Sequence, residues 1–217
     1  MPGRIEDYAL IGDLQTAALV GRDGSVDWLC LPRFDSAACF AALLHDPSAG
    51  RWLLAPVDGG PATRRRYRGD SLVLESEWDT AGGSVRVVDF MPPTTGPPMS
   101  CGSWSACPVA MRMDLLLRFD YGSVAPWVRT DGPDLGAVAG PDAVWLRAGA
   151  PLATEADRCT AAFRVRAGER VPFVLTYRAS HLPVPSPVLA DEALAATATG
   201  SPGAGTGGGG TARSAAR

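Results

Sequence analysis

Short runs of alternating apolar and polar residues, separated by turn sequences, are the feature that most limits the folds open to this chain of 217 residues. The clearest pair, residues 16–20 and 26–31, flanks the sequence Gly21-Arg22-Asp23-Gly24. An Asp-Gly step between two such runs is typical of a tight β-hairpin turn. Alternation with a period near two is the pattern of a half-buried strand. This region therefore predicts two antiparallel strands.

Strand-like runs continue along most of the chain. Residues 79–83 and 167–170 are short turn sequences that join neighbouring runs. The further runs are residues 72–77, 84–90, 111–120, 143–147, 161–166 and 171–177. Many strands at short intervals, with Gly and Pro between them, favour an all-β antiparallel sandwich. Strands do not alternate with long helical segments, so a doubly wound parallel fold is disfavoured.

Two segments have helical character. Residues 37–44 are rich in Ala and Leu, and either Asp35 or Ser36 before them could cap a helix, which predicts one short internal helix. Residues 191–198 could begin another, but we expect it not to develop because the Gly- and Ala-rich sequence that follows has nothing to bury. The sequence predicts a sandwich domain over residues 1–195 and a disordered tail over residues 196–217.

Composition and charge exclude several classes of function. A hydrophobic fraction of 46% and a charged fraction of 20% are ordinary for a soluble globular protein, and a net charge of −3 argues against a nucleic-acid partner. The basic run at residues 64–68 would alternate between the faces of a strand, as a solvated edge does. No segment is long and apolar enough for a signal peptide or a membrane span, so we expect a cytoplasmic protein with no membrane partner. The absence of Lys and Asn predicts a GC-rich bacterial gene.

The five cysteines lack the spacing of a metal site. Cys30 and Cys39 lie in apolar surroundings and are expected to be small buried side chains. Cys101 and Cys107 have few histidines to complete a zinc site with, since the chain has only two. We therefore expect reduced thiols, no metal and no cofactor.

Several ordered blocks resemble the start of bacterial glycoside hydrolases of family 15, the trehalase and glucoamylase type. The resemblance extends from residue 5 to about residue 195, and its longest parts include Asp27-Trp28-Leu29-Cys30-Leu31-Pro32-Arg33-Phe34-Asp35-Ser36. The blocks are residues 5–20, 23–36, 50–56, 67–70, 89–93, 117–122, 140–143 and 168–170.

The resemblance implies a super-β-sandwich that packs against a C-terminal (α/α)6 barrel. In such inverting α-glucosidases the barrel holds both catalytic glutamates, whose carboxyl groups lie roughly 6.5–9.5 Å apart. This chain ends where that barrel would begin, so we expect a non-catalytic N-terminal fragment that supports a barrel. The alternative is a stand-alone module that binds an α-glucan or trehalose, or docks on a barrel encoded separately. Chemistry within the sandwich is least favoured, and the choice between trehalase and glucoamylase stays open.

Residues 99–109 depart from the family pattern, which has an alternating strand there. A local frameshift that was later compensated is a hypothesis for this segment, and the tail could share that origin. Such a replacement would disturb local order because the strand loses its alternation. The codons of the gene test the hypothesis.

The candidate site residues are Trp28, Arg33, Asp35 and Ser36, and none of them is a catalytic or metal-binding candidate. A loop that reaches the sugar site of a barrel could stack Trp28 on a pyranose ring, while Arg33 and Asp35 bind hydroxyl groups. The alternative is structural: Trp28 lies in the core, Arg33 pairs with Asp35, and Ser36 caps the helix.

Other polar and aromatic residues are given structural roles. Asp13 and Asp27 flank the first hairpin, where turn or hairpin-end duty explains them better than acid/base chemistry. His181 has no carboxylate nearby in sequence to orient it. The tryptophans at positions 52, 78, 127 and 145 are expected in the core. A sandwich built to pack on a barrel should also expose apolar surface, so we expect the isolated chain to self-associate.

Overall fold

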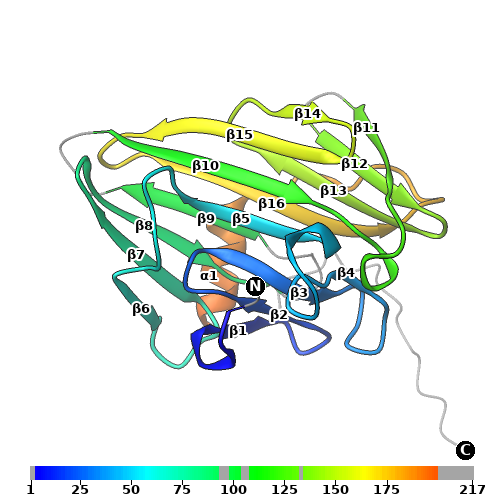
Figure 1. The fold of residues 1–217 in the computed structure, drawn as a ribbon, viewed down its shortest axis with the longest axis horizontal. Coiled ribbons are helices and arrows are strands. Elements are labelled where there is room, and N and C mark those ends of the chain that lie inside the picture. The colour runs from blue at the N-terminus through cyan, green and yellow to red at the C-terminus, as the bar shows by residue number, and fades with distance from the viewer. Residues whose placement is uncertain (1–2, 93–97, 104–107, 132–133, 200–217) are drawn as a thin grey trace, which may run out of the picture.

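The computed structural model describes residues 3–92, 98–103, 108–131 and 134–199, and these form two antiparallel sheets packed face to face (Figure 1). Each sheet has eight strands. The predicted all-β antiparallel sandwich is therefore confirmed. The described residues contain one α-helix, so no (α/α)6 barrel lies within them. None of the helices in this part of the chain is long and apolar enough to cross a membrane.

The first sheet carries the N-terminal hairpin and the second carries the arginine-rich edge. In spatial order the first sheet is β1 (Ala9–Gly12), β2 (Ala17–Val20), β3 (Ser25–Cys30), β5 (Arg51–Pro56), β10 (Val109–Leu116), β15 (Arg158–Val165) and β14 (Ala153–Glu155), with β4 (Ala38–Phe40) paired to β3. The second sheet is β11 (Trp127–Asp131), β12 (Asp134–Ala139), β13 (Asp142–Ala148), β16 (Arg170–Ala179), β9 (Pro98–Ser103), β8 (Gly83–Asp89), β7 (Leu74–Thr80) and β6 (Arg64–Tyr67). Three 3-10 turns, η1 (Ile5–Asp7), η2 (Pro47–Ala49) and η3 (Asp120–Gly122), lie in the loops.

Alternating side chains from both sheets fill one core. On β10, Met111 and Met113 are buried while Arg112 between them is exposed. Trp52 of β5 and Phe173 of β16 are fully buried and bring the largest volumes to the same cluster. Burial of apolar area is the main favourable contribution to folding, at about 25 cal/mol per Å². The period-two pattern of the sequence thus becomes the inside and outside of a sandwich.

The helix predicted over residues 37–44 is wrong. Residues Ala38–Phe40 form β4, which pairs with β3, and a turn follows. All three residues of β4 are buried, so tertiary packing outweighs the helical propensity of the Ala-rich sequence. Ser36 caps no helix; its Oγ accepts a hydrogen bond from the Arg33 backbone N–H at 3.2 Å and closes the loop before β4.

The helix that we expected not to develop does form, as α1 (Ala190–Thr199). Ala193 is buried against Val73, Val88 and Phe90 on the outer face of the second sheet. This packing supplies the stabilisation that a short helix lacks on its own. Helix α1 crosses the boundary predicted at residue 195, and the tail predicted to be disordered lies outside the described residues from position 200 on.

The segment that departs from the family pattern still supplies a strand. Residues Pro98–Ser103 form β9, which pairs with β8 on one side and β16 on the other. Residues 104–107 lie outside the described part. The frameshift hypothesis stays a prediction. Whatever the origin of the segment, β9 occupies the place between β8 and β16 in the sheet.

Candidate functional site

A β-bulge in β3 brings two functional side chains to the outer face of the first sheet. The pairing of β2 with β3 shifts between Leu19 and Val20, so β3 holds one extra residue. Val26 and Leu29 are both fully buried in the main core, three positions apart instead of two. Asp27 and Trp28, which lie between them, are only half-buried. The bulge therefore turns a carboxylate and an indole ring outward side by side.

Trp28 lies outside the main core, in a small cluster beside the loops. It packs against Cys30, Ala38, Ala41 and Ala49, and its ring centroid is 6.1 Å from that of Tyr121. The indole is thus supported by protein on one side and half-buried. This arrangement is intermediate between the sugar-stacking and core positions that the sequence left open.

The loop after β3 holds the remaining sequence-predicted candidates. Arg33 donates two hydrogen bonds to the Asp35 carboxylate, from Nε at 3.0 Å and from Nη2 at 2.8 Å. Both side chains are about two-thirds exposed, so this ion pair contributes little to stability. The predicted pairing of Arg33 with Asp35 is confirmed, and both side chains are exposed at the surface.

Exposed apolar side chains gather on the loops around this region, and we call them the loop-end surface. The loop after β3 is joined to the β1–β2 turn by a hydrogen bond from the Phe34 N–H to the Gln15 carbonyl at 3.0 Å. The segment before η3 is joined to β4 by a hydrogen bond from the Arg118 N–H to the Cys39 carbonyl at 3.2 Å. The loops around β4 and η3 lie together at one end of the sandwich (Figure 1). The loop-end surface consists of Leu14, Phe34, Leu44, Tyr121 and Val124, which are 41% to 94% exposed.

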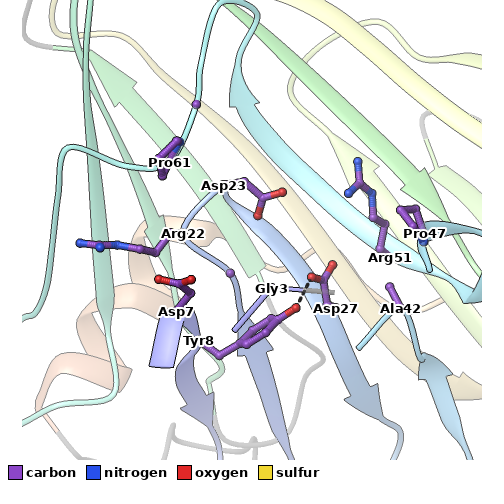
Figure 2. A pocket seen from close by; sticks show the side chains of 12 residues that line it. Gly3, Asp7, Tyr8, Arg22, Asp23, Asp27, Ala42, Pro47, Arg51 and Pro61 are labelled. Carbon is purple, nitrogen blue, oxygen red and sulfur yellow. Dashed lines mark hydrogen bonds between the residues drawn. The ribbon is translucent and has the colours of Figure 1, made fainter. Parts of the chain in front are cut away.

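Next to the bulge lies a cavity of about 470 Å³ whose walls come from several separate segments (Figure 2). Tyr8 follows η1, Arg22 and Asp23 lie in the first hairpin turn, Asp27 lies in β3, and Arg51 begins β5. The Tyr8 hydroxyl donates a hydrogen bond to Asp27 Oδ2 at 2.7 Å. The rest of the lining is Gly3, Asp7, Gly21, Ala42, Pro47, Gly60 and Pro61. We call this the Tyr8 pocket.

The electrostatics of the Tyr8 pocket are set by partial burial. Burial raises the pKa of Asp27, although the hydrogen bond from Tyr8 acts to lower it. Burial and the neighbouring Asp27 carboxylate raise the pKa of Tyr8, so its hydroxyl stays a proton donor. Asp27 Oδ1 is buried and has no hydrogen-bond partner among the described residues. Asp23 is held in place because its Oδ1 accepts a hydrogen bond from Ser25 Oγ at 2.6 Å.

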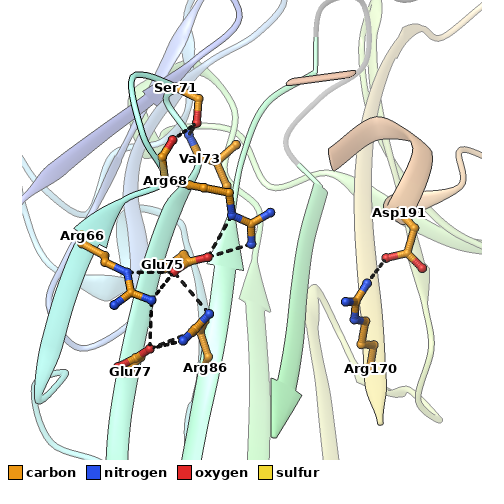
Figure 3. Close-up of polar contacts among 9 residues, drawn as sticks. All are labelled: Arg66, Arg68, Ser71, Val73, Glu75, Glu77, Arg86, Arg170 and Asp191. Atoms are coloured by element: carbon orange, nitrogen blue, oxygen red, sulfur yellow. Dashed lines mark hydrogen bonds and ion pairs between the residues drawn. The ribbon is translucent and has the colours of Figure 1, made fainter. Parts of the chain in front are cut away.

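A second group of charged residues, at the β6 edge, is held together by ion pairs within the group. Glu75 of β7 accepts hydrogen bonds from Arg66 Nε at 3.0 Å and from Arg68 Nε at 2.9 Å, and Arg86 pairs with both Glu75 and Glu77 (Figure 3). Burial alone would raise the pKa of Glu75, but the hydrogen bonds from Arg68 and Arg66 lower it. The predicted edge position of this basic run is confirmed. The arginines and glutamates of this cluster pair with one another, so we assign them a structural role at the sheet edge.

A separate ion pair in Figure 3 joins α1 to the second sheet. Arg170 Nη1, at the start of β16, lies 2.6 Å from Asp191 Oδ1. Both side chains are more than two-thirds exposed, so packing of Ala193 contributes more to this contact than the charges do.

For the other residues considered in the sequence analysis, some of the predicted positions are confirmed and others are wrong. Asp13 has its predicted turn role, because its Oδ1 accepts hydrogen bonds from the N–H groups of Gln15 and Thr16 at 2.9 and 2.8 Å. Trp52, Trp78 and Trp145 are buried as expected. Trp127 is not, with 71% of its surface exposed at the start of β11. Asp27 was assigned to the hairpin end, and instead it lies at the bulge and lines the Tyr8 pocket. His181 is exposed in the loop after β16.

The cysteines behave as small buried residues where they are described. Cys30, Cys39 and Cys159 are free and buried. Burial raises the pKa of Cys159 to about 11, which disfavours the reactive thiolate. The side chains of Cys101 and Cys107 lie outside the described part. Among the described residues, His, Cys, Asp and Glu form no group of three or more that could hold a metal ion.

Comparison with known proteins gives consistent matches. A family model described as "Trehalase-like, N-terminal" matches residues 1–182. The chain is 27% identical over 164 residues to a trehalase of Thermoplasma volcanium, which covers 71% of this chain and 26% of that protein. It is 44% identical over 87 residues to the trehalase of Mycobacterium tuberculosis, which covers 40% of this chain and 13% of that protein. The chain therefore matches only a small part of the length of these relatives.

Proposed function

Because this chain belongs to the trehalase-like N-terminal domain family, we propose that it is the non-catalytic β-sandwich domain of a trehalase-type α-glucoside hydrolase. Its role in this proposal is to support an (α/α)6 barrel, either in the same polypeptide or encoded separately. The relatives that match are trehalases, which favours trehalose over the ends of starch as the substrate of the whole enzyme.

The observation that carries the proposal is the loop-end surface. Phe34 is 62% exposed and Leu44 is 56% exposed, on loops that hydrogen bonds tie to their neighbours. Several large apolar side chains exposed on neighbouring loops are typical of a surface that another protein part covers. The loops are already ordered, so docking would cost little conformational entropy. We therefore place the barrel on this end of the sandwich.

With the barrel at this end, all the candidate site residues predicted from the sequence would lie near the proposed interface. Trp28 lies beside Tyr121 of the loop-end surface, and the exposed Arg33–Asp35 pair lies on the next loop with Ser36. A barrel docked here would bring these side chains toward its sugar site. Arg33 offers donors and Asp35 offers acceptors to sugar hydroxyl groups.

We expect the purified chain to bind the catalytic part of Mycobacterium tuberculosis trehalase in isothermal titration calorimetry. Substituting both Phe34 and Tyr121 by Asp should weaken that binding about a hundredfold, because buried aromatic side chains dominate the affinity of such interfaces. Leu189→Asp is the matched control, since Leu189 is 60% exposed and lies just before α1. Equal binding by the double variant and the control would contradict the proposed docking surface. Self-association of the isolated chain stays a prediction of the same surface.

A second candidate function is a stand-alone module that binds a sugar. The Tyr8 pocket favours it, because carboxylate and guanidinium side chains from separate segments line this cavity. The two candidates differ in where they place the functional surface. Docking requires the loop-end surface, whereas sugar binding requires the Tyr8 pocket.

A further inference from the structure

A second cavity lies at the β6 edge, where the first hairpin turn approaches the second sheet. It measures about 370 Å³, and its arginines come from two segments, with Arg22 in the turn between β2 and β3 and the others in β6. Arg22 turns its guanidinium group away from the Tyr8 pocket (Figure 2). A hydrogen bond from the Ala62 N–H to the Arg22 carbonyl, at 2.6 Å, joins the hairpin to the segment before β6. We call this the arginine cavity, and its lining is Arg22, Arg64, Arg65, Arg66, Glu75 and Glu77.

The two glutamates in the wall are already engaged by arginines. Glu75 Oε2 lies 2.9 Å from Arg66 Nη2, and Glu77 Oε2 lies 3.1 Å from Arg64 Nε. Two further arginines outside the lining pair with the same glutamates (Figure 3). Asp79 adds one negative charge at 3.7 Å from Arg64. Because arginines outnumber carboxylates in the wall and around it, the cavity keeps an excess of positive charge.

Arg22 and Arg65 have no carboxylate partner among the described residues. Arg65 Nη1 donates a hydrogen bond to the Val20 carbonyl at 3.0 Å, which fixes the guanidinium group against a neutral acceptor. Burial and the positive charge of Arg22 lower the pKa of Arg65, although nearby acidic groups act to raise it. Two guanidinium groups that line one cavity repel each other, and an anion between them would replace this repulsion by attraction.

The chemistry of the guanidinium group indicates the kind of anion. Its planar fork of N–H donors matches two oxygens of a carboxylate or a phosphate group. A carboxylate has only two oxygens to offer, whereas a phosphate group has enough to meet the forks of Arg22 and Arg65 together. The cavity volume falls within the roughly 300–1,000 Å³ of pockets that hold small molecules, so it has room for more than the phosphate group itself.

We propose that the arginine cavity binds a phosphate group, either as inorganic phosphate or as the phosphate ester of a small molecule. Arg22 and Arg65 donate hydrogen bonds to its oxygens, while Arg64 and Arg66 stay paired with the glutamates and add positive potential. This inference goes beyond the domain-support role and does not rest on it, because no residue of the arginine cavity belongs to the loop-end surface.

The test is calorimetric titration of the chain in a phosphate-free buffer with inorganic phosphate and with glucose 6-phosphate, at constant ionic strength. Glucose is the neutral comparison. We expect saturable binding of one phosphate compound or both, and none of glucose. Arg22→Gln and Arg65→Gln should each weaken this binding about tenfold or more, because each removes charged donors to the anion. Arg112→Gln is the matched control, since it removes the same charge from an exposed position on β10 and should bind like the unaltered chain.

Circular dichroism shows whether each variant is folded. Arg22 is exposed on the hairpin turn, so Arg22→Gln keeps the test valid if loss of the Arg65 hydrogen bond to Val20 unfolds the other variant. Tighter binding of glucose 6-phosphate than of inorganic phosphate would identify an ester as the ligand, and equal affinities would identify the phosphate group alone.

Three results would overturn the proposal. They are the lack of saturable binding by both phosphate compounds, equal weakening by Arg22→Gln and Arg112→Gln, and tighter binding of a polyglutamate peptide, which would assign the arginines to an acidic protein partner. None of these results bears on the docking experiment, so failure of the arginine cavity and failure of the domain-support role are distinguishable.

Discussion

Asp89→Asn is expected to raise the free energy of unfolding by about 4 kcal/mol near pH 8, and to change it little near pH 4. Asp89 is fully buried on β8, and neither of its carboxylate oxygens has a hydrogen-bond partner among the described residues. It takes the same side of β8 as Val85 and Val87, whose side chains lie in the main core. An ionised carboxylate there is strongly disfavoured.

The pH dependence follows from the two ionisation states. Burial raises the pKa of Asp89 from 3.8 to about 7 in the folded chain, although Arg65 acts to lower it. Between these values the folded chain keeps a proton that the unfolded chain has lost, so stability falls as the pH rises. Above pH 7 the full cost of the buried charge is present, and below pH 4 it is absent. Asparagine has a similar shape and never ionises, so it removes the cost.

Urea unfolding of the two proteins at several pH values measures this difference. Asp70→Asn is the control, because the side chain at this exposed turn should show no comparable dependence. A stability difference between Asp89→Asn and the unaltered chain that does not change from pH 4 to pH 8 would contradict the assignment of Asp89 as a buried, unpaired carboxyl group.

Gly24→Ala should destabilise the chain by about 3 kcal/mol or more, since strain and a backbone clash add together. Gly24 closes the β2–β3 hairpin with φ of +85°, which favours glycine. A Cβ atom at this position would lie 2.5 Å from the Leu54 carbonyl oxygen and 3.3 Å from the Trp78 ring. The backbone oxygen cannot move away without disturbing β5, so the strain would spread to the Tyr8 pocket beside the hairpin.

Gly140→Ala separates the two contributions. Gly140 has φ of +60°, but a Cβ atom there would meet nothing within 4 Å. It should therefore cost only about 1 kcal/mol, from the backbone conformation alone. Chemical denaturation of both variants gives the comparison. Equal costs at the two glycines would show that close packing of the hairpin on β5 is not what requires Gly24.

The sandwich was predictable because strand alternation and turn chemistry are local signals. The Asp-Gly turn predicted the β2–β3 hairpin, and alternation over residues 143–147 and 171–177 predicted β13 and β16. The failure at residues 37–44 has a physical cause, since Ala-rich sequence suits a buried strand and a helix alike until its neighbours are known. Helix α1 likewise depends on an apolar patch that the sequence places far away, at Val73 and Phe90.

The Tyr8 pocket could not be predicted as a site. Tyr8, Arg22 and Arg51 come from separate segments, and only the pairing of β1, β2, β3 and β5 brings them together. One signal was present in the sequence. Val26 and Leu29 are the apolar residues of their strand that enter the core, and their spacing of three breaks the alternation at the position of the bulge. At the bulge, Asp27 therefore lines the Tyr8 pocket instead of having a structural role at the end of the hairpin.

The most direct test of the proposed role is the release of glucose from trehalose by the purified chain. Inversion at a glycosidic bond needs two opposed carboxyl groups around a substrate, and the proposed function assigns that pair to a barrel outside this domain. Mycobacterium tuberculosis trehalase, assayed under the same conditions, is the positive control. The account predicts no glucose above the level in protein-free buffer. Release of glucose by the chain alone, in material freed of other hydrolases, would contradict it.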